Sequence, residues 1–452
     1  MSKFRTKKSN LQTFRQERRQ APAGTQVLTI IDQLEDGRGV GKFEGKIVFV
    51  ERALKGEEVK VKFTKSFKKF DEAKTVKVML PSNNRTTPLC TYFGSCGGCN
   101  LQHFEFQAQT QFKQKNIELR MANAELIGKN DLKLEMADSV SSPPYQYRHR
   151  ARLSVEANSS KCVIGFKGSK SNKLVDITAC EILLPRLNSI IPDLRKTISN
   201  LVGRSKILEV LILEDSNAQL FVQMRTGRNL LAIDLTKLID FSAKSGVLVE
   251  CNNLPDNSTY WKSGLESPTS ILPDEGITFN HTLTDFTQIN PSVNGKMLKQ
   301  ACQWLDLSTK DHVLDLFCGI GNFSLPIAKR VNHVHGYEIS AYMVEKAEGN
   351  AIINELKNTS FSVADLFSHK LDFDSRVNKV ILDPPRIGAE HVCTQLARTR
   401  MTTILYVSCN PASFFRDAKI LTDGGYRLVK LGTVDMFPQT EHIELMGLFQ
   451  VQ

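Results

Sequence analysis

The sequence has 452 residues, 41% of them hydrophobic and 24% charged, and carries a formal net charge of +11. A chain of this length and composition can bury two or three hydrophobic cores, which indicates an ordinary globular protein. No apolar run reaches the length of a signal-peptide core or a membrane span, so we expect a cytoplasmic protein without a membrane partner. The sequence shows no sign of an obligate protein partner, and we expect a monomer.

The positive charge is concentrated near the N-terminus. Residues 1–80 contain 19 Lys or Arg against 10 Asp or Glu, an excess of nine of the eleven net charges. A solubilising tail would explain the first twenty residues, but the excess continues through residues 60–77, where lysines alternate with Phe63, Phe67 and Phe70. Basic and aromatic residues in this pattern favour a nucleic acid as the partner.

Three parts with different patterns follow one another along the chain. Residues 27–30, 46–50, 59–63 and 75–80 read as short strands separated by glycines, which predicts a small β-barrel of the kind that binds single-stranded nucleic acid. A helix is expected over residues 102–126, and residues 147–249 read mostly as strands with two helices. We therefore expect a basic tail at 1–20, a barrel at 21–80, a central domain at 81–281 and a C-terminal domain at 282–452. In the central part, Arg148, His149, Arg150 and Arg152 form either an exposed strand face or a second RNA contact.

The C-terminal part alternates apolar β runs with helical segments. The runs are 312–317, 334–337, 361–364, 379–382 and 403–408. Such alternation predicts a doubly wound parallel sheet covered by helices on both faces. Ligands of these sheets bind at the carboxyl ends of the strands.

A glycine turn and three acidic strand ends predict the cofactor. Gly319 and Gly321 follow the first strand, but Ser324 stands where a dinucleotide fold needs its third glycine, which argues against NAD. Glu338, 19 residues after Gly319, can accept both hydroxyls of a ribose, and Asp365 and Asp383 end the next two strands. Acids suit a cationic adenosyl cofactor better than a polyphosphate, so we expect S-adenosylmethionine. The ordinary alternative for each acid is a helix cap.

A cysteine at the end of the fifth strand is the candidate nucleophile. Cys409 precedes Asn410, which can cap a helix, and Pro411, which can begin it, so the helix dipole would favour the thiolate. The preceding strand ends in Asp383-Pro384-Pro385, a turn found in many base-directed methyltransferases. A buried structural cysteine would be the ordinary alternative.

Methylation of carbon 5 of uracil would use both a nucleophile and a base. A thiolate adds to carbon 6, carbon 5 then attacks the methyl sulfonium, and a base removes the proton from carbon 5 so that the cysteine can leave. The C-terminal segment 437–444 offers Glu444 as the base, with His442 and Glu441 as rivals.

These motifs resemble the RNA 5-methyluridine (uracil-C5) methyltransferase family, in its 23S rRNA subgroup with an N-terminal TRAM domain and an iron-sulfur cluster. The resemblance extends from about residue 25 to the C-terminus. It implies an OB-like TRAM barrel, a Rossmann-like methyltransferase domain, Cys409 as nucleophile and Glu444 as base. It also implies S-adenosylmethionine contacts from Gln288, Phe317, Asn322, Glu338, Asp365 and Asp383.

Three clustered cysteines predict a metal site. Cys90, Cys96 and Cys99 lie within ten residues of one another, with Gly97 and Gly98 between the last two. Their spacing differs from the pattern of radical enzymes, and a tetrathiolate zinc site competes with an iron-sulfur cluster. The resemblance implies a 4Fe-4S cluster with Cys180 as the fourth ligand, and Cys162 is the local competitor. A fully ligated cluster favours a structural or RNA-positioning role over catalysis.

Other functions remain as alternatives. The same uracil chemistry could act on tRNA instead of 23S rRNA. A cytosine-5 methyltransferase would have a cysteine where Arg386 follows Asp383-Pro384-Pro385, and an adenine N-methyltransferase would leave Cys409 and Glu444 without a task. A non-catalytic iron-sulfur RNA-binding protein would bind RNA without transferring a methyl group.

Overall fold

The computed structural model describes residues 18–124, 134–254, 256–368 and 370–451. Its chain divides into two compact units, one formed by the residues up to Thr87 together with His103–Glu105, the other by Pro88–Gln102 and Phe106 onward. The expected boundary between residues 281 and 282 lies inside the second unit and stays a prediction. No described helix combines the length and the apolar character needed to cross a bilayer. The basic tail of the first seventeen residues lies outside the described residues.

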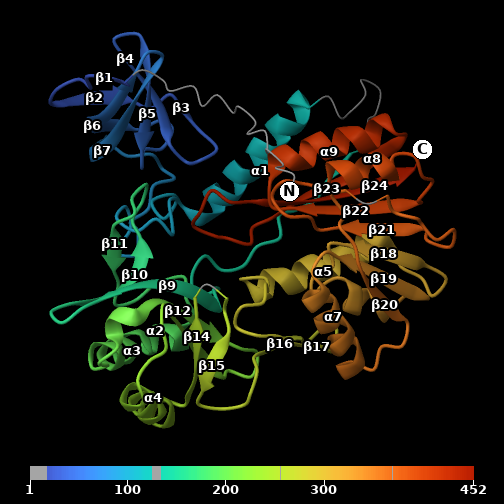
Figure 1. The fold of residues 1–452 in the computed structure, drawn as a ribbon. Helices are drawn as coiled ribbons and strands as arrows, with labels where there is room; N and C mark the ends of the chain where they lie inside the picture. The colour runs from blue at the N-terminus through green and yellow to red at the C-terminus, as the bar shows by residue number, and fades with distance from the viewer. Residues whose placement is uncertain (1–17, 125–133, 255, 369, 452) are drawn as a thin grey trace, which may run out of the picture. The chain divides into compact units, whose positions relative to one another are not determined.

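The first unit is built from β-strands (Figure 1). These are β1 (Arg18–Arg19), β2 (Thr25–Thr29), β3 (Asp32–Gln33), β4 (Gly39–Phe43), β5 (Lys46–Glu51), β6 (Glu58–Phe67) and β7 (Phe70–Leu80). They form one sheet in the order β1-β6-β7-β5-β4-β3, with β2 also paired to β6. Alternate residues of β6 are buried, and Val59, Val61 and Phe63 contribute to a small core.

The aromatic residues of this unit are placed differently from the sequence expectation. Phe63 is buried and contacts Phe43 at a ring-centroid distance of 5.3 Å, so it is a core residue and not part of a base-stacking surface. The rings of Phe67 and Phe70 contact each other in a tilted arrangement, with centroids 4.7 Å apart, and are only partly buried. Successive side chains of β6 point to opposite faces of the sheet, so Phe63 lies on the inner face, whereas Lys60 and Lys62 lie on the outer face.

The second unit begins with the cysteine loop and the long helix α1 (Phe106–Asn123), followed by a predominantly antiparallel sheet. The sheet runs in the order β11-β10-β9-β12-β13-β14-β15. Its strands are β9 (Arg150–Ala157), β10 (Cys162–Lys167), β11 (Leu174–Asp176), β12 (Ile207–Glu214), β13 (Leu220–Thr226), β14 (Val247–Asn253) and β15 (Thr259–Lys262). Where two helices were expected, the structure has α2 (Pro185–Ser189), α3 (Ile191–Ser199) and α4 (Ala232–Ser245), with a short 3-10 turn η1 (Arg204–Lys206). A hairpin of β16 (Thr269–Leu272) and β17 (Ile277–Asn280) leads onward.

A mixed sheet with helices on both faces forms the rest of the chain (Figure 1). Its strands are β8 (Glu135–Met136), β18 (His312–Leu316), β19 (His333–Glu338), β20 (Thr359–Val363), β21 (Lys379–Leu382), β22 (Thr403–Ser408), β23 (Tyr426–Val434) and β24 (Glu444–Val451). One core joins the sheet to α5 (Pro291–Leu305), α6 (Ser324–Ala328) and α7 (Ala341–Ile353). The other core joins it to α1, α8 (Glu390–Leu396) and α9 (Pro411–Asp423).

The strand order corrects the expectation of a purely parallel sheet. The order is β20-β19-β18-β21-β22-β24-β23-β8, and β20 through β22 are parallel as predicted. β24, however, runs antiparallel between β22 and β23. Its register pairs Ser408 with Leu445 and Val434 with Glu444. Glu444 therefore begins β24 at the level where β22 has just ended at Cys409.

Candidate active site

A cavity of about 920 Å³ lies at the carboxyl ends of the parallel strands. Its lining includes seven of the eight residues expected to act in catalysis or cofactor binding: Gln288, Phe317, Asn322, Glu338, Asp383, Cys409 and Glu444. The volume falls in the upper range of small-molecule sites, which leaves space for a base beside a nucleoside cofactor. Tyr147 and His149, just before β9, and Glu214, at the end of β12, complete the wall. Sequence reasoning considered His149 only as part of a strand face or an RNA contact, and it missed Tyr147 and Glu214.

The glycine turn after β18 shapes one end of the cavity. Phe317, Gly319 and Gly321 all have positive φ, at 67°, 55° and 95°, which two glycines adopt without cost. Glu338 closes the turn from the next strand, since its carboxylate accepts hydrogen bonds from the backbone N–H of Gly319 at 3.2 Å and of Ser340 at 3.1 Å. Each carboxylate oxygen keeps a second lone pair, so Glu338 can still accept hydroxyl groups of a ligand.

Acidic groups dominate the charge of the cavity. Burial, followed by the charge of the nearby Asp315, raises the pKa of Asp383 to about 7. Asp315, beneath the glycine turn, accepts a hydrogen bond from Ser324, while its other carboxylate oxygen has no hydrogen-bond partner among the described residues. Arg386 is the one Lys or Arg among the described residues that line the cavity. Carboxyl groups held out of water in this way favour a cationic ligand such as a sulfonium.

The remaining expected cofactor contacts are placed as follows. Asn322 exchanges side-chain hydrogen bonds with Asn294 of α5 at 2.9 and 3.1 Å, which fixes its amide at the cavity wall. Asp365 does not line the cavity, and its carboxylate accepts from the backbone of Phe367 and from the Ser368 hydroxyl. It thereby orders the turn that brings Phe367 against Phe317, with ring centroids 5.6 Å apart.

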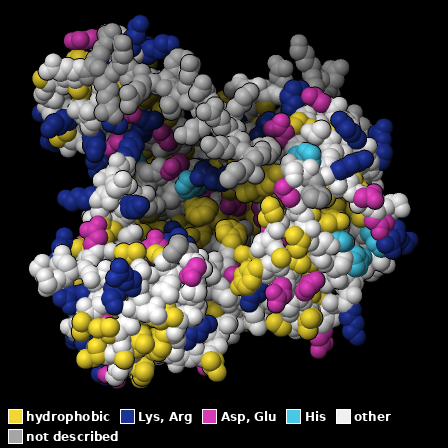
Figure 2. Space-filling view, in the orientation of Figure 1, with side chains coloured by type: hydrophobic (Ala, Val, Ile, Leu, Met, Phe, Trp, Pro, Cys, Tyr) yellow, Lys and Arg dark blue, Asp and Glu magenta, His cyan; other side chains and the backbone are white. Residues whose placement is uncertain are grey.

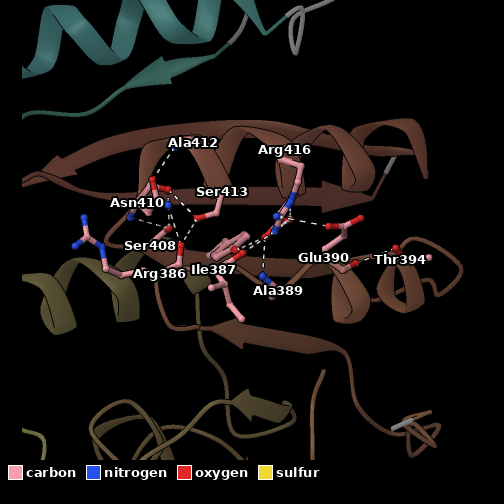
Figure 3. A network of polar contacts seen from close by, with 12 residues as sticks. Arg386, Ile387, Ala389, Glu390, Thr394, Ser408, Asn410, Ala412, Ser413 and Arg416 are labelled. Carbon is pink, nitrogen blue, oxygen red and sulfur yellow. Dashed lines mark hydrogen bonds and ion pairs between the residues drawn. The ribbon is translucent and has the colours of Figure 1, made fainter. Parts of the chain in front are cut away.

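Cys409 sits between β22 and α9, as the sequence predicted. Asn410 is the N-cap of α9, where its side chain accepts from the backbone N–H of Ala412 at 3.1 Å, and Pro411 is the first helical residue. The same cap holds the neighbouring loop, because Asn410 and Ser413 both donate to the backbone carbonyl of Arg386 (Figure 3). The side chain of Arg386 extends away from this network (Figure 3).

The acidity of Cys409 departs from the sequence prediction. The helix N-terminus was expected to favour the thiolate, but burial raises the pKa of Cys409, and the carboxyl groups of Glu444 and Asp383 raise it further. Arg386 acts in the opposite direction and does not outweigh them. In the free protein Cys409 is therefore a thiol that needs additional positive charge nearby to ionise.

Of the three candidate bases, Glu444, the one preferred from the sequence, is the one that lines the cavity. Burial, followed by the charges of Asp383 and Asp435, raises the pKa of Glu444 to about 8. Glu441 does not line the cavity but pairs with Asn100, and His442 is exposed and packs edge-on against Phe437. A carboxyl group with a pKa near neutrality can accept and release a proton at the pH of a cell.

Comparisons with known proteins agree with this geometry. A family model described as tRNA (Uracil-5-)-methyltransferase matches residues 107–451. The chain belongs to the uracil-5-methyltransferase family. Among curated relatives of this family, the 23S rRNA (uracil(1939)-C(5))-methyltransferase RlmD of Shewanella halifaxensis is 37% identical, over 94% of this chain and 95% of the relative. The enzyme of the same name from Pectobacterium atrosepticum is 36% identical, over 96% and 95%.

A solved structure of the same family shares the fold. The Pyrococcus abyssi tRNA (uracil-54, C5)-methyltransferase, in complex with S-adenosyl-L-homocysteine, superposes with a TM-score of 0.74 and 25% sequence identity. The match covers 93% of this chain and 99% of that one. The methyltransferase fold and the use of S-adenosylmethionine are therefore properties of this family member.

The four cysteines expected to bind metal lie together in this family member. Burial, together with the charges of Cys180, Cys96 and Cys90, raises the pKa of Cys99 to about 12, so all four thiols are neighbours. The backbone N–H of Gly97 donates to the carbonyl of Lys167 at 3.0 Å. The side-chain amide of Asn188 accepts from the backbone N–H of Cys180 at 2.8 Å and donates to the carbonyl of Cys180 at 2.9 Å. Among the described residues, no three Cys, His, Asp or Glu side chains converge on the position of a single metal ion.

The basic stretch at the start of the central sheet serves mainly structure. Arg150 donates to the backbone carbonyls of Leu283 and Asp285, and His149 contacts the carbonyl of Ile289 at 3.0 Å. These contacts hold the segment that carries Gln288 at the cavity. Of the four residues considered as an exposed face or RNA contact, Arg152 is the exposed one, and 59% of its side chain is accessible to solvent.

Proposed function

We propose that this protein methylates carbon 5 of a uridine in 23S rRNA through a covalent bond between Cys409 and carbon 6. The observation that carries the proposal is that Cys409 and Glu444 line the same cavity as the glycine turn and Glu338. The relatives that match over nearly the whole chain are named as 23S rRNA enzymes, which favours rRNA over tRNA.

The residues of the cavity divide the reaction between them. S-adenosylmethionine, when bound, supplies the methyl group on a positively charged sulfur. Cys409 adds to carbon 6 as a thiolate, which makes carbon 5 nucleophilic enough to take the methyl group. Glu444 then removes the proton from carbon 5, the electron pair of that bond restores the carbon 5–carbon 6 double bond, and the bond between sulfur and carbon 6 breaks. Gln288, Phe317, Asn322, Glu338, Asp365 and Asp383 are the residues we assign to cofactor binding, Asp365 through the turn at Phe367.

The first unit is proposed to be a TRAM domain that binds RNA. In its sheet, Lys60 lies opposite Lys77 and Lys62 opposite Lys74, and all four side chains are exposed. Like charges directly opposite each other destabilise a sheet, so their presence here favours a polyanionic partner that neutralises them. Figure 2 shows Lys and Arg side chains over the surface of this unit.

The four cysteines are proposed to hold a 4Fe-4S cluster. A zinc site would need four sulfurs about 2.3 Å from one point, and the described residues show no such convergence. An iron-sulfur cluster is larger than one ion and takes its thiolates at separate corners, which suits neighbouring thiols that do not converge. We expect iron and acid-labile sulfide in the purified protein, and their absence would contradict this assignment.

Two experiments test the proposed function. Mass spectrometry of 23S rRNA and tRNA nucleosides from a deletion strain should show loss of one 5-methyluridine from rRNA, and loss from tRNA alone would refute the rRNA assignment. The uridine corresponding to the one in the relatives' name is the first position to examine. In vitro, 5-fluorouridine RNA with the cofactor should form a covalent adduct on Cys409 that Cys409→Ala cannot form, whereas cofactor binding persists. A non-catalytic RNA-binding protein would form no adduct in either case.

A further inference from the structure

The residues that follow Cys99 contact the segment that leads to Glu444. The backbone N–H groups of Asn100 and Leu101 both donate to the carbonyl of Gln439, at 3.1 and 3.0 Å. The Asn100 side chain accepts from the backbone N–H of Glu441 at 3.0 Å and donates to the Glu441 carboxylate. Four hydrogen bonds thus join the cysteine loop to a segment 341 residues away in sequence.

The contacted segment needs this support because its backbone is strained. Gln439 has a φ of +71°, which is unfavourable for a residue with a side chain. It is 2% exposed, and its side chain accepts from Gln109 of α1 at 3.0 Å. The hydroxyl of Tyr147 donates to the carbonyl of Pro438 at 2.9 Å. The conformation of residues 438–441 is therefore set largely by partners outside the segment.

The same segment determines the position of Glu444, the proposed base. It connects Val434, the last residue of β23, to Glu444, the first residue of β24, and these two are paired in register. Its start is held by the buried ion pair of Lys113 and Asp435 at 2.8 Å. Asn100 holds its far side, three residues before the base. A displacement of residues 439–441 would therefore shift the Glu444 carboxyl group, while Cys409, anchored by the cap of α9, would stay in place.

We propose that Asn100 is a positioning residue for Glu444 and links the conformation of the cysteine loop to the release of the methylated uridine from Cys409. This rests on the proposed function, in which Glu444 removes the proton from carbon 5. It also gives Glu441 a task, as the partner of Asn100. The loop that Asn100 continues is shaped by Cys90, Cys96 and Cys99, so its conformation depends on whatever those thiols hold.

The proposal predicts which step fails. Formation of the bonds from sulfur to carbon 6 and from the methyl group to carbon 5 needs Cys409 and the methyl donor but not the base. Breaking the bond from sulfur to carbon 6 needs Glu444 to take the proton from carbon 5. In Asn100→Ala, the methylated covalent complex should therefore accumulate, with its release slowed roughly 10- to 100-fold, because a misplaced base loses part of a 10²- to 10⁴-fold contribution.

Single-turnover experiments with methyl-labelled cofactor measure the two steps separately. The full-length protein is mixed with RNA, and the labelled covalent complex and free 5-methyluridine are followed in time for wild type, Asn100→Ala, Glu441→Ala and the double variant. Gln114→Ala on α1, whose side chain contacts Glu118, is the control. We expect adduct formation within about two-fold of wild type in all variants, slow release in the three that break the contact, and no further slowing in the double variant.

Other outcomes overturn the proposal. If Asn100→Ala slows adduct formation as much as release, the contact is a general structural one. If neither step changes, the link has no function. Glu444→Gln is measured in parallel and should accumulate the methylated covalent complex. If Glu444→Gln accumulates no such complex, the proposed covalent mechanism fails, whatever the result for Asn100→Ala.

Hydrogen exchange provides a readout that does not depend on activity. The backbone N–H of Glu441 donates to Asn100, so peptides covering residues 437–444 should exchange faster in Asn100→Ala than in wild type. The same peptides should exchange faster in wild-type protein stripped of iron by a chelator than in protein as purified. Exchange that is unchanged by both treatments would show that the cysteine loop does not control this segment.

Discussion

Glu444→Gln should stabilise the fold while it blocks release of the product. Burial raises the pKa of Glu444 to about 8 from an ordinary value of 4.5. Between these two pH values the folded protein keeps a proton on this side chain that the unfolded chain has lost. Folding therefore takes up a proton in this window, and the free energy of unfolding falls as the pH rises.

The size of the effect follows from the two pKa values. One pKa unit corresponds to about 1.4 kcal/mol, so at pH 7 the buried acid costs about 3 kcal/mol relative to a group that never ionises. At pH 5 the cost is less than about 1 kcal/mol, since this pH lies only half a unit above the ordinary pKa and ionisation of the unfolded chain stabilises it little. Glutamine has nearly the same shape but no charge, so the substitution should recover about 3 kcal/mol at pH 7 and less than about 1 kcal/mol at pH 5.

Tryptophan fluorescence during urea unfolding measures this difference in the right part of the chain. The protein has two tryptophans, Trp261 and Trp304, and both belong to the second unit. Glu348→Gln, the same chemical change on an exposed face of α7, is the matched control and should leave stability unchanged at both pH values. Equal stability of Glu444→Gln and wild type at pH 7, or a gain of the same size at pH 5, would refute the assignment of a buried, neutral Glu444.

Four further predictions concern binding and rate. The rate at which free 5-methyluridine appears in a single turnover should rise with pH through the pKa of Glu444 at about 8, since release needs the deprotonated base; a flat profile would contradict this. At pH 7, calorimetry in buffers of different ionisation enthalpy should show proton release on binding of cationic S-adenosylmethionine and less on binding of neutral S-adenosylhomocysteine. Glu338→Gln should weaken S-adenosylhomocysteine binding about 10- to 100-fold in the same calorimeter, the loss expected for a charged hydrogen bond, and an unchanged Kd would remove Glu338 from the site. The last prediction concerns the four opposed lysines of the first unit, Lys60, Lys62, Lys74 and Lys77. If each contacts a phosphate of single-stranded RNA, replacing all four by glutamine should reduce the slope of log affinity against log salt concentration by about three, as measured by filter binding. An unchanged slope would show that RNA binds elsewhere.

Local signals in the sequence predicted the parts of the site that depend on neighbouring residues. The strand, cap and helix around Cys409 were predicted because Asn410 and Pro411 carry that information within three residues, and the structure confirms the cap. The same holds for Glu338, which ends β19 as expected. The helix cap and the strand end both depend on residues that are adjacent in sequence, so a single segment is enough to predict each of them.

Long-range pairing could not be predicted in the same way. Nothing local distinguishes an antiparallel β24 from another parallel strand, yet its place beside β22 is what brings Glu444 to Cys409. The contact of Asn100 with Glu441 joins residues 341 positions apart. The raised pKa of Cys409 also required the structure, because the helix N-terminus is visible in sequence whereas burial and two approaching carboxyl groups are not.

In the proposed mechanism, the electrostatics of the cavity explain how a poorly ionised thiol could serve as the nucleophile. Burial raises the pKa values of Cys409, Asp383 and Glu444, so that near neutral pH Cys409 and Glu444 are mostly protonated in the free protein, and Arg386 is the cation that acts on Cys409. A permanent thiolate beside these acids would need a positive charge in addition to Arg386, and the described residues that line the cavity include no other Lys or Arg. A positively charged sulfonium bound among them stabilises the ionised form of each acid, so binding of the methyl donor should lower the pKa of Cys409. Reactivity is thereby coupled to occupancy: the sulfur becomes a strong nucleophile at the stage at which its adduct can be methylated.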